Sequence, residues 1–252
     1  MVIFLCRDDF YSIICGVYDA WMSRLGHDNV RLALKDCGNL EMFAEYRDAV
    51  ESEEKFQKVI SAVRQKICVE AYKWIFHVSL SWEEGKADFI YRFLIYGFHY
   101  GPSVLEQLQI PAVHEIFRLN RAVGGEQHLQ LEFVRFSEMK GNVLFSRIGP
   151  KNDVLNLIAP HFADRLNAER WIIYDVNRKK AAVYDPDGGW LIMAVDSEEW
   201  QKKLSEETDE KLYQNLWRAF FNSVAIEERK NYICQRGHLP IRFRPYMTEF
   251  GG

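Results

Sequence analysis

The sequence has few cysteines, no metal-binding spacing and no long apolar run. Its five cysteines are an odd number, and no two of them have the CxxC spacing of a zinc ribbon or redox motif. A disulfide framework is therefore not expected, and we predict reduced thiols in a cytoplasmic protein. The apolar start at residues 2–6 is followed directly by Arg7, so it is too short for the core of a signal peptide. No run approaches the ~18 apolar residues of a membrane helix, so no membrane contact is expected.

The sequence also lacks the short motifs of several enzyme classes and any excess of positive charge. There is no GxSxG nucleophile motif, no Walker phosphate loop and no GxGxxG dinucleotide motif. The 32 basic and 36 acidic residues give a net charge of −4, so the whole chain is not a polycation. Any binding of nucleic acid must therefore come from a local basic patch.

The composition that remains is that of a folded globular protein. Hydrophobic residues make up 48% and aromatic residues 14% of the 252 residues, which is enough apolar surface for a sizeable core. We expect a single domain over residues 1–252, with a mostly helical part at 1–125, a sheet-rich part at 126–195, and a helical part with a basic tail at 196–252.

The first half of the chain shows mainly helical periodicity. A short buried strand is predicted at residues 2–6 and another at 29–34. Asp8 or Asp9 is predicted to cap the first helix. Gly124 and Gly125 are expected to end the fourth. The expected helices run to about residue 25, from 53 to 78, from 87 to 99, and from 111 to 123.

From residue 129 the apolar period changes from helical to alternating. Turn signals at 140–142, 177–180 and 185–189 separate strands expected at 129–136, 143–148, 171–176, 181–185 and 190–195. From about 197 to 226 the pattern is helical again. The predicted fold class is α+β: a mainly antiparallel sheet over about residues 129–195, flanked by an N-terminal helical region and C-terminal helices.

Polar residues are concentrated between Glu126 and Arg178. On a strand, Glu126 and His128 would face the same side, with Arg135 further along. Asp175 ends another expected strand, where it is either a functional carboxylate or a turn cap. Glu126, His128, His161 and Asp175 are suitable ligand types for one divalent metal, but no HExxH-like spacing supports this, so no metal ligand or other cofactor is assigned.

A second candidate site lies around His161. Pro160 is best placed at the first position of a helix, which would put His161 beside free amide groups and Arg165 one turn further along. A helix start with these two side chains would suit an anion or phosphate. The alternative is that His161 is a hydrogen-bonded core histidine and that Arg165 pairs with a carboxylate.

The third feature is a basic tail over residues 229–247. It contains no acidic residue, and aromatic residues lie between its basic ones, which are Arg229, Lys230, Arg236, Arg242 and Arg244. Such a mixture can neutralise phosphates and stack on bases. The alternative is that these arginines pair with the acidic stretch between residues 198 and 228.

Several segments together resemble a known bacterial family over essentially the full chain. They are EQHLQLEFVRF (126–136), PHFADR (160–165), IIYDVNR (172–178), YQNLWRAFFNSVAIEERKN (213–231) and LPIRFRPYM (239–247). The family carries a domain of unknown function, number 4130, and its members are labelled probable DNA metabolism or DNA repair proteins. Its marked positions correspond here to Glu126, His128, Arg135, Phe136, His161, Phe162, Arg165, Asp175, Arg178, Arg229, Asn231, Pro240 and Arg242. The chain departs from the pattern at Glu132-Phe133, where relatives often have Gly-Phe.

The resemblance implies a role connected with DNA but transfers no catalytic residue. It implies a neighbouring DNA-repair radical-SAM protein as partner, and related domains are fused to uracil-DNA-glycosylase-like domains. The leading hypothesis is a DNA-binding accessory factor that uses Arg135, Arg165, Arg178, Arg229, Arg236, Arg242 and Arg244. The alternatives are a metal-dependent nuclease or lesion-processing enzyme, with His161 or His128 as base and Glu126 or Asp175 assisting, and an interaction module without nucleic-acid contact.

Overall fold

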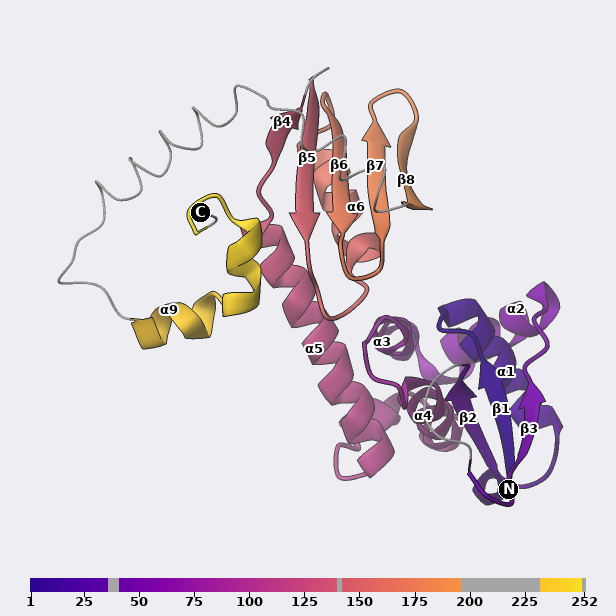
Figure 1. Cartoon of the computed structure of the whole chain (residues 1–252). Helices are drawn as coiled ribbons and strands as arrows, with labels where there is room; N and C mark the ends of the chain where they lie inside the picture. The colour runs from indigo at the N-terminus through magenta and orange to yellow at the C-terminus, as the bar shows by residue number, and fades with distance from the viewer. Residues whose placement is uncertain (36–40, 140–141, 196–231, 251–252) are drawn as a thin grey trace. The chain divides into compact units, whose positions relative to one another are not determined.

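The computed structural model describes residues 1–35, 41–139, 142–195 and 232–250. Strands and helices are combined in an α+β fold, as predicted, and the chain divides into two compact units, Met1–Gly124 and Gly125–Gly252 (Figure 1). No helix in these ranges is long and apolar enough to cross a membrane. Cys6, Cys15 and Cys68 are free thiols, and Cys37 lies outside the described residues.

The first unit is built around a short parallel sheet. The central strand β1 (Val2–Cys6) pairs with β2 (Val30–Leu34) on one side and β3 (Glu45–Asp48) on the other, both in parallel. The β1 strand is almost wholly buried, as expected for an apolar strand in a parallel sheet. Helix α1 (Phe10–Met22) follows, and Asp9 caps it by accepting a 2.7 Å hydrogen bond from the Ser12 backbone N–H.

Helices complete the first unit. They are η1 (His27–Asn29), α2 (Glu53–Ala62), the π-helix η2 (Val63–Ile67), α3 (Val69–Ser79), α4 (Lys86–Tyr100), η3 (Gly101–Glu106) and the part of α5 (Pro111–Phe133) up to Gly124. The single helix predicted from 53 to 78 is interrupted at Cys68. The backbone of Cys68 is extended (φ −172°), and its sulfur accepts the Ala71 N–H that begins α3. A side-chain cap therefore starts a new helix inside one continuous amphipathic pattern.

Helix α5 (Pro111–Phe133) contradicts two predictions: that Gly124-Gly125 ends this helix, and that a strand runs from 129 to 136. The alternating apolar residues are explained by a helix that is buried on two sides. Leu129 and Phe133 pack with Leu239, Phe243 and Met247, whereas Leu131 packs into the cluster around α6. An apolar pattern on two helix faces resembles the alternation of a strand.

The sheet of the second unit is mixed, with strand order β4-β5-β6-β7-β8. Its strands are β4 (Ser137–Met139), β5 (Val143–Ile148), β6 (Arg170–Asp175), β7 (Lys180–Asp185) and β8 (Gly189–Ala194). The β5–β6 pair is parallel because α6 (Leu155–Arg165) provides the crossover between them. The mainly antiparallel sheet predicted over about residues 129–195 is therefore a mixed sheet, and the first unit contains a second sheet that is wholly parallel.

An aromatic core joins α6 to this sheet. Trp171 is fully buried on β6 and stacks on Tyr184 of β7, with 5.2 Å between ring centroids. Phe162 of α6 meets Phe136 edge-on, with 5.3 Å between the ring centroids.

Helix α9 (Tyr232–His238) and the 3-10 helix η5 (Ile241–Tyr246) follow near the C-terminus. The helix predicted from 197 to 226 lies outside the described residues.

The continuity of α5 can be tested at Gly125, which is exposed and where an added Cβ would meet no atom within 4 Å. In a helix interior, Gly125→Ala should raise the free energy of unfolding by about 0.5–1 kcal/mol, because alanine loses less backbone entropy. Urea denaturation measures this change. Gly16→Ala is the contrasting variant, because its Cβ would collide with Cys6 Sγ and destabilise the protein. A loss of stability in Gly125→Ala would contradict a continuous helix.

Candidate functional site

The loop at residues 149–154 connects β5 to α6 and is the centre of the polar cluster. It lies where β5 ends, beside the end of its parallel neighbour β6. Carboxyl ends of parallel strands are common locations for ligand sites in α/β structures. Side chains from three distant parts of the second unit contact this loop.

Glu126 of α5 fixes one side of the loop. Its side chain is buried, at 2% exposed, and Oε2 accepts hydrogen bonds from the Asn152 backbone N–H and from Asn152 Nδ2, both at 2.7 Å. Oε1 accepts from the Lys151 N–H at 2.9 Å and from Arg242 Nη2 at 2.9 Å. Both carboxylate oxygens are therefore occupied, and the negative charge is balanced by Arg242.

Asp175, at the end of β6, fixes the other side through Arg178. Asp175 is fully buried and accepts hydrogen bonds from the backbone N–H of Asn177 (2.9 Å) and of Arg178 (3.3 Å). Arg178 Nη1 donates to Asp175 Oδ2 at 3.2 Å and to the Pro150 carbonyl at 3.1 Å, and Nη2 donates to the Lys151 carbonyl. Burial raises the pKa of the Asp175 carboxyl above its usual range, and the positive charge of Arg178 opposes part of this rise.

Two further contacts also hold the loop. Asn177 Nδ2 donates to the Pro150 carbonyl at 2.9 Å, and Lys180 forms an ion pair with Asp153. The segments around residues 126, 175–180 and 242 therefore converge on this one loop. Of the predicted site residues, the structure brings together Glu126, Asp175, Arg178 and Arg242.

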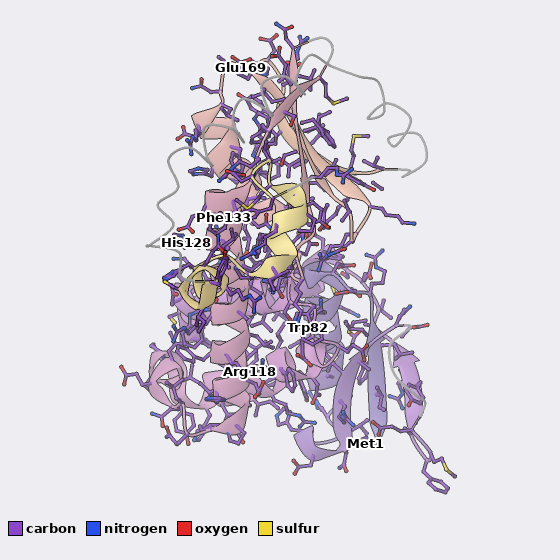
Figure 2. All side chains as sticks on the ribbon, turned by 60° about the vertical axis from the view of Figure 1, so that its left-hand side comes forward. Met1, Trp82, Arg118, His128, Phe133 and Glu169 are labelled. Atoms are coloured by element: carbon purple, nitrogen blue, oxygen red, sulfur yellow. The ribbon has the colours of Figure 1, made fainter. Side chains whose placement is uncertain are left out.

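The two predicted catalytic histidines lie elsewhere on the surface of the second unit. His128 is 73% exposed and pairs with Glu132 one turn along α5, on the helix that also carries the labelled Phe133 (Figure 2). On a helix, Glu126 and His128 face different directions, so the prediction that they share one side is wrong.

His161 is also exposed, but it does not stand at a helix start. Helix α6 begins at Leu155, and Pro160 lies inside it, so the predicted helix start at Pro160 is wrong. The carbonyl group that loses its helical partner at Pro160 belongs to Asn156, which is exposed and can be hydrated. This explains how the helix accommodates a proline in its interior.

The remaining predicted arginines are dispersed. Arg135 pairs with Glu249 at 3.2 Å. Arg244 donates to Gln235 at 3.3 Å and lies over the Phe250 ring, 4.9 Å from its centroid. Arg165 on α6 and Arg236 on α9 are exposed. Arg229 lies outside the described residues, as does the acidic stretch proposed to pair with the tail.

Sequence reasoning missed the loop residues themselves. Asn152 is 4% exposed and is the loop side chain most closely held by Glu126. The run Pro150-Lys151-Asn152-Asp153 is typical of a turn between a strand and a helix. This turn signal would have pointed to the site if β5 and β6 had been predicted to be parallel, because the loop then lies beside the end of both strands. In the part of the chain that the structure describes, no group of three or more His, Cys, Asp or Glu side chains could hold a metal ion.

Removal of the Glu126 carboxylate should destabilise the protein. Glu126→Ala removes the carboxylate oxygen that accepts from the backbone N–H and from Nδ2 of the buried Asn152, and we expect a loss of about 2–4 kcal/mol in the free energy of unfolding. Glu126→Gln keeps one acceptor oxygen and should lose less. Urea denaturation compares both with Glu132→Ala, an exposed helix residue expected to change stability by no more than about 0.5 kcal/mol. Equal effects at the two positions would refute the structural role of Glu126.

Asp175 should give a pH dependence opposite to that of an ordinary salt-bridged carboxylate. Because its pKa is raised in the folded state, its contribution to stability is greatest when it is protonated and is lost as the pH rises through the raised pKa. The free energy of unfolding of the wild type minus that of Asp175→Asn should therefore fall as the pH rises from the ordinary aspartate pKa to neutrality. The exposed Asp164→Asn is the control and should show little of this trend. A difference that grows with pH would contradict the assigned shift.

Comparison with known proteins agrees with the sequence resemblance. A search of curated proteins found no match. The model of the family DUF4130, described as a domain of unknown function, matches residues 84–249, which is about two thirds of the 252 residues. The matched range contains the loop at 149–154 and every side chain described above as contacting it. The chain therefore belongs to the DUF4130 family.

Proposed function

We propose that the protein is a DNA-binding accessory factor in DNA metabolism or repair, and that the loop at 149–154 and its cationic neighbours contact the phosphate backbone. The observation that carries this proposal is the convergence of cationic side chains in and around one loop. Arg178, Lys180 and Arg242 contact the loop or the carboxylate that holds it, and the exposed residues Lys151, in the loop, and Lys179, in the turn before β7, add two further positive charges.

The arrangement of charge from the interior to the surface supports contact with an anion. The carboxylates of Glu126 and Asp175 are buried beneath the loop, whereas Arg242 keeps 42% and Arg178 25% of its side chain exposed. A guanidinium group that is oriented by a buried carboxylate still has further N–H groups to donate to a phosphate. Prior orientation lowers the entropy lost on binding.

The same contacts favour binding over catalysis by the predicted residues. Both oxygens of Glu126 and of Asp175 already accept hydrogen bonds. Among the described residues, neither His128 nor His161 is hydrogen-bonded to either carboxylate. A general base needs a partner within hydrogen-bonding reach, and a metal needs available oxygens. The alternative of a metal-dependent nuclease or lesion-processing enzyme therefore has no support from this cluster.

The proposal includes a partner that performs the chemistry. The family resemblance points to a radical-SAM or glycosylase-like repair protein in the cytoplasm, and the chain has no CxxC spacing with which to hold an iron–sulfur cluster of its own. In this proposal the DUF4130 protein holds DNA while the partner modifies or removes a base.

DNA binding can be measured with short single- and double-stranded oligonucleotides over a series of salt concentrations. If about five phosphates are contacted, the logarithm of the duplex binding constant should fall with the logarithm of salt concentration with a slope of about −4 to −5. Lys179→Gln should reduce this slope by about 1. Arg170→Gln, at the opposite end of β6, is the matched control and should leave it unchanged. Absence of binding at low salt would overturn the proposal and favour an interaction module without nucleic-acid contact.

A further inference from the structure

The first unit contains a cavity that the proposed DNA-binding function does not use. It has a volume of about 350 Å³ and lies between α1, α2, η2 and α4. Its lining includes Tyr18, Trp21, Lys58, Lys66 and Phe98. This volume is within the range of small-molecule sites. We propose that the cavity binds a small aromatic anion of the nucleoside monophosphate class.

Aromatic rings form one part of the lining. Trp21 of α1 meets Phe98 of α4 edge-on, with 5.3 Å between centroids, and also packs edge-on against His27 at 4.8 Å. Tyr18 lies one turn before Trp21 on α1. These contacts hold Trp21 in place, so an aromatic surface is already formed before a ligand enters. Flat apolar rings bind well to such a surface.

Two lysines supply the charge. Lys58, Ala62 and Lys66 follow at steps of four residues, so they lie along one side of α2 and η2. At the helical rise, the two lysine backbones are roughly 12 Å apart. The cavity lining includes no acidic residue. Lys58 is paired with Glu54 at 2.5 Å, outside the lining, and both side chains are mostly exposed. An anionic group is therefore the complementary occupant.

The position of Lys66 depends on an unusual backbone. Lys66 belongs to the π-helix Val63–Ile67, a form that is rare and often found at functional sites. The next residue, Ile67, is fixed against α4, because its Cδ1 is 2.6 Å from where a Cβ on residue 97 would lie. Only glycine at position 97 allows this approach. The π-helix is thus packed tightly against α4 beside the aromatic lining.

Ring and charge together define the ligand class. A purely apolar ligand would leave the lysines without an anionic partner in the cavity, and free phosphate would leave the aromatic lining unused. A base or similar ring that carries a phosphate satisfies both. Its source is either a free nucleotide or the terminal nucleotide of a nucleic-acid strand, which share this chemistry.

The test is isothermal titration calorimetry of the full chain with adenosine 5′-monophosphate, adenosine and inorganic phosphate. The monophosphate should bind, and adenosine and phosphate should each bind at least roughly fivefold more weakly. Lys58→Gln and Lys66→Gln should each weaken binding of the monophosphate by roughly fivefold. Lys73→Gln, an exposed lysine on α3 outside the cavity, is the control and should have no effect.

Two outcomes would overturn the proposal: no binding of the monophosphate, or equal affinity in the wild type and both cavity variants. A 5′-phosphorylated dinucleotide distinguishes the two sources. If it binds more tightly than the monophosphate and its binding still depends on Lys66, the ligand is the end of a strand. If it binds more weakly than the monophosphate, the ligand is a free nucleotide. Lys179→Gln in the second unit should leave binding of the monophosphate unchanged. The result is therefore separable from the DNA-binding proposal.

Discussion

The buried carboxylate of Glu126 requires partners, and this requirement organises the polar part of the second unit. A carboxylate at 2% exposure is costly unless it is paired and hydrogen-bonded. Here the partners are the backbone and side chain of one loop together with Arg242, a residue 116 positions further along the chain. The same contacts that satisfy the charge also fix the loop between β5 and α6.

Asp175 applies the same principle at the end of the neighbouring strand. Its partner Arg178 donates to two loop carbonyls, so the loop is held by acceptors on one side and by donors on the other. The resulting surface combines buried negative charge with partly exposed guanidinium groups. Such a surface is suited to binding an anion, and its carboxylates are not available as bases or metal ligands. This difference separates the proposed binding role from the catalytic alternative.

Much of the fold could be predicted from local pattern, whereas the site depended on long-range pairing. The short strand at 2–6 and the helix near 87–99 have clear periodicity and were predicted close to their observed bounds. The pattern at 129–136 predicts a strand, but residues 129–133 belong to α5, because a helix buried on two faces resembles an alternating strand. The parallel pairing of β5 and β6 has no local signal, so the importance of Asn152 could not be recognised. Glu126 and Asp175 were selected as catalytic residues for their chemical type, and the structure shows both in hydrogen-bonded pairs.

Hydrogen exchange of the loop amides tests the central claim most directly. The backbone N–H groups of Lys151 and Asn152 belong to no helix or strand, and both donate to Glu126. If the buried carboxylate fixes the loop, both amides should exchange as slowly as those of the sheet core. Rapid exchange of both, at the rate of an exposed turn, would contradict the account.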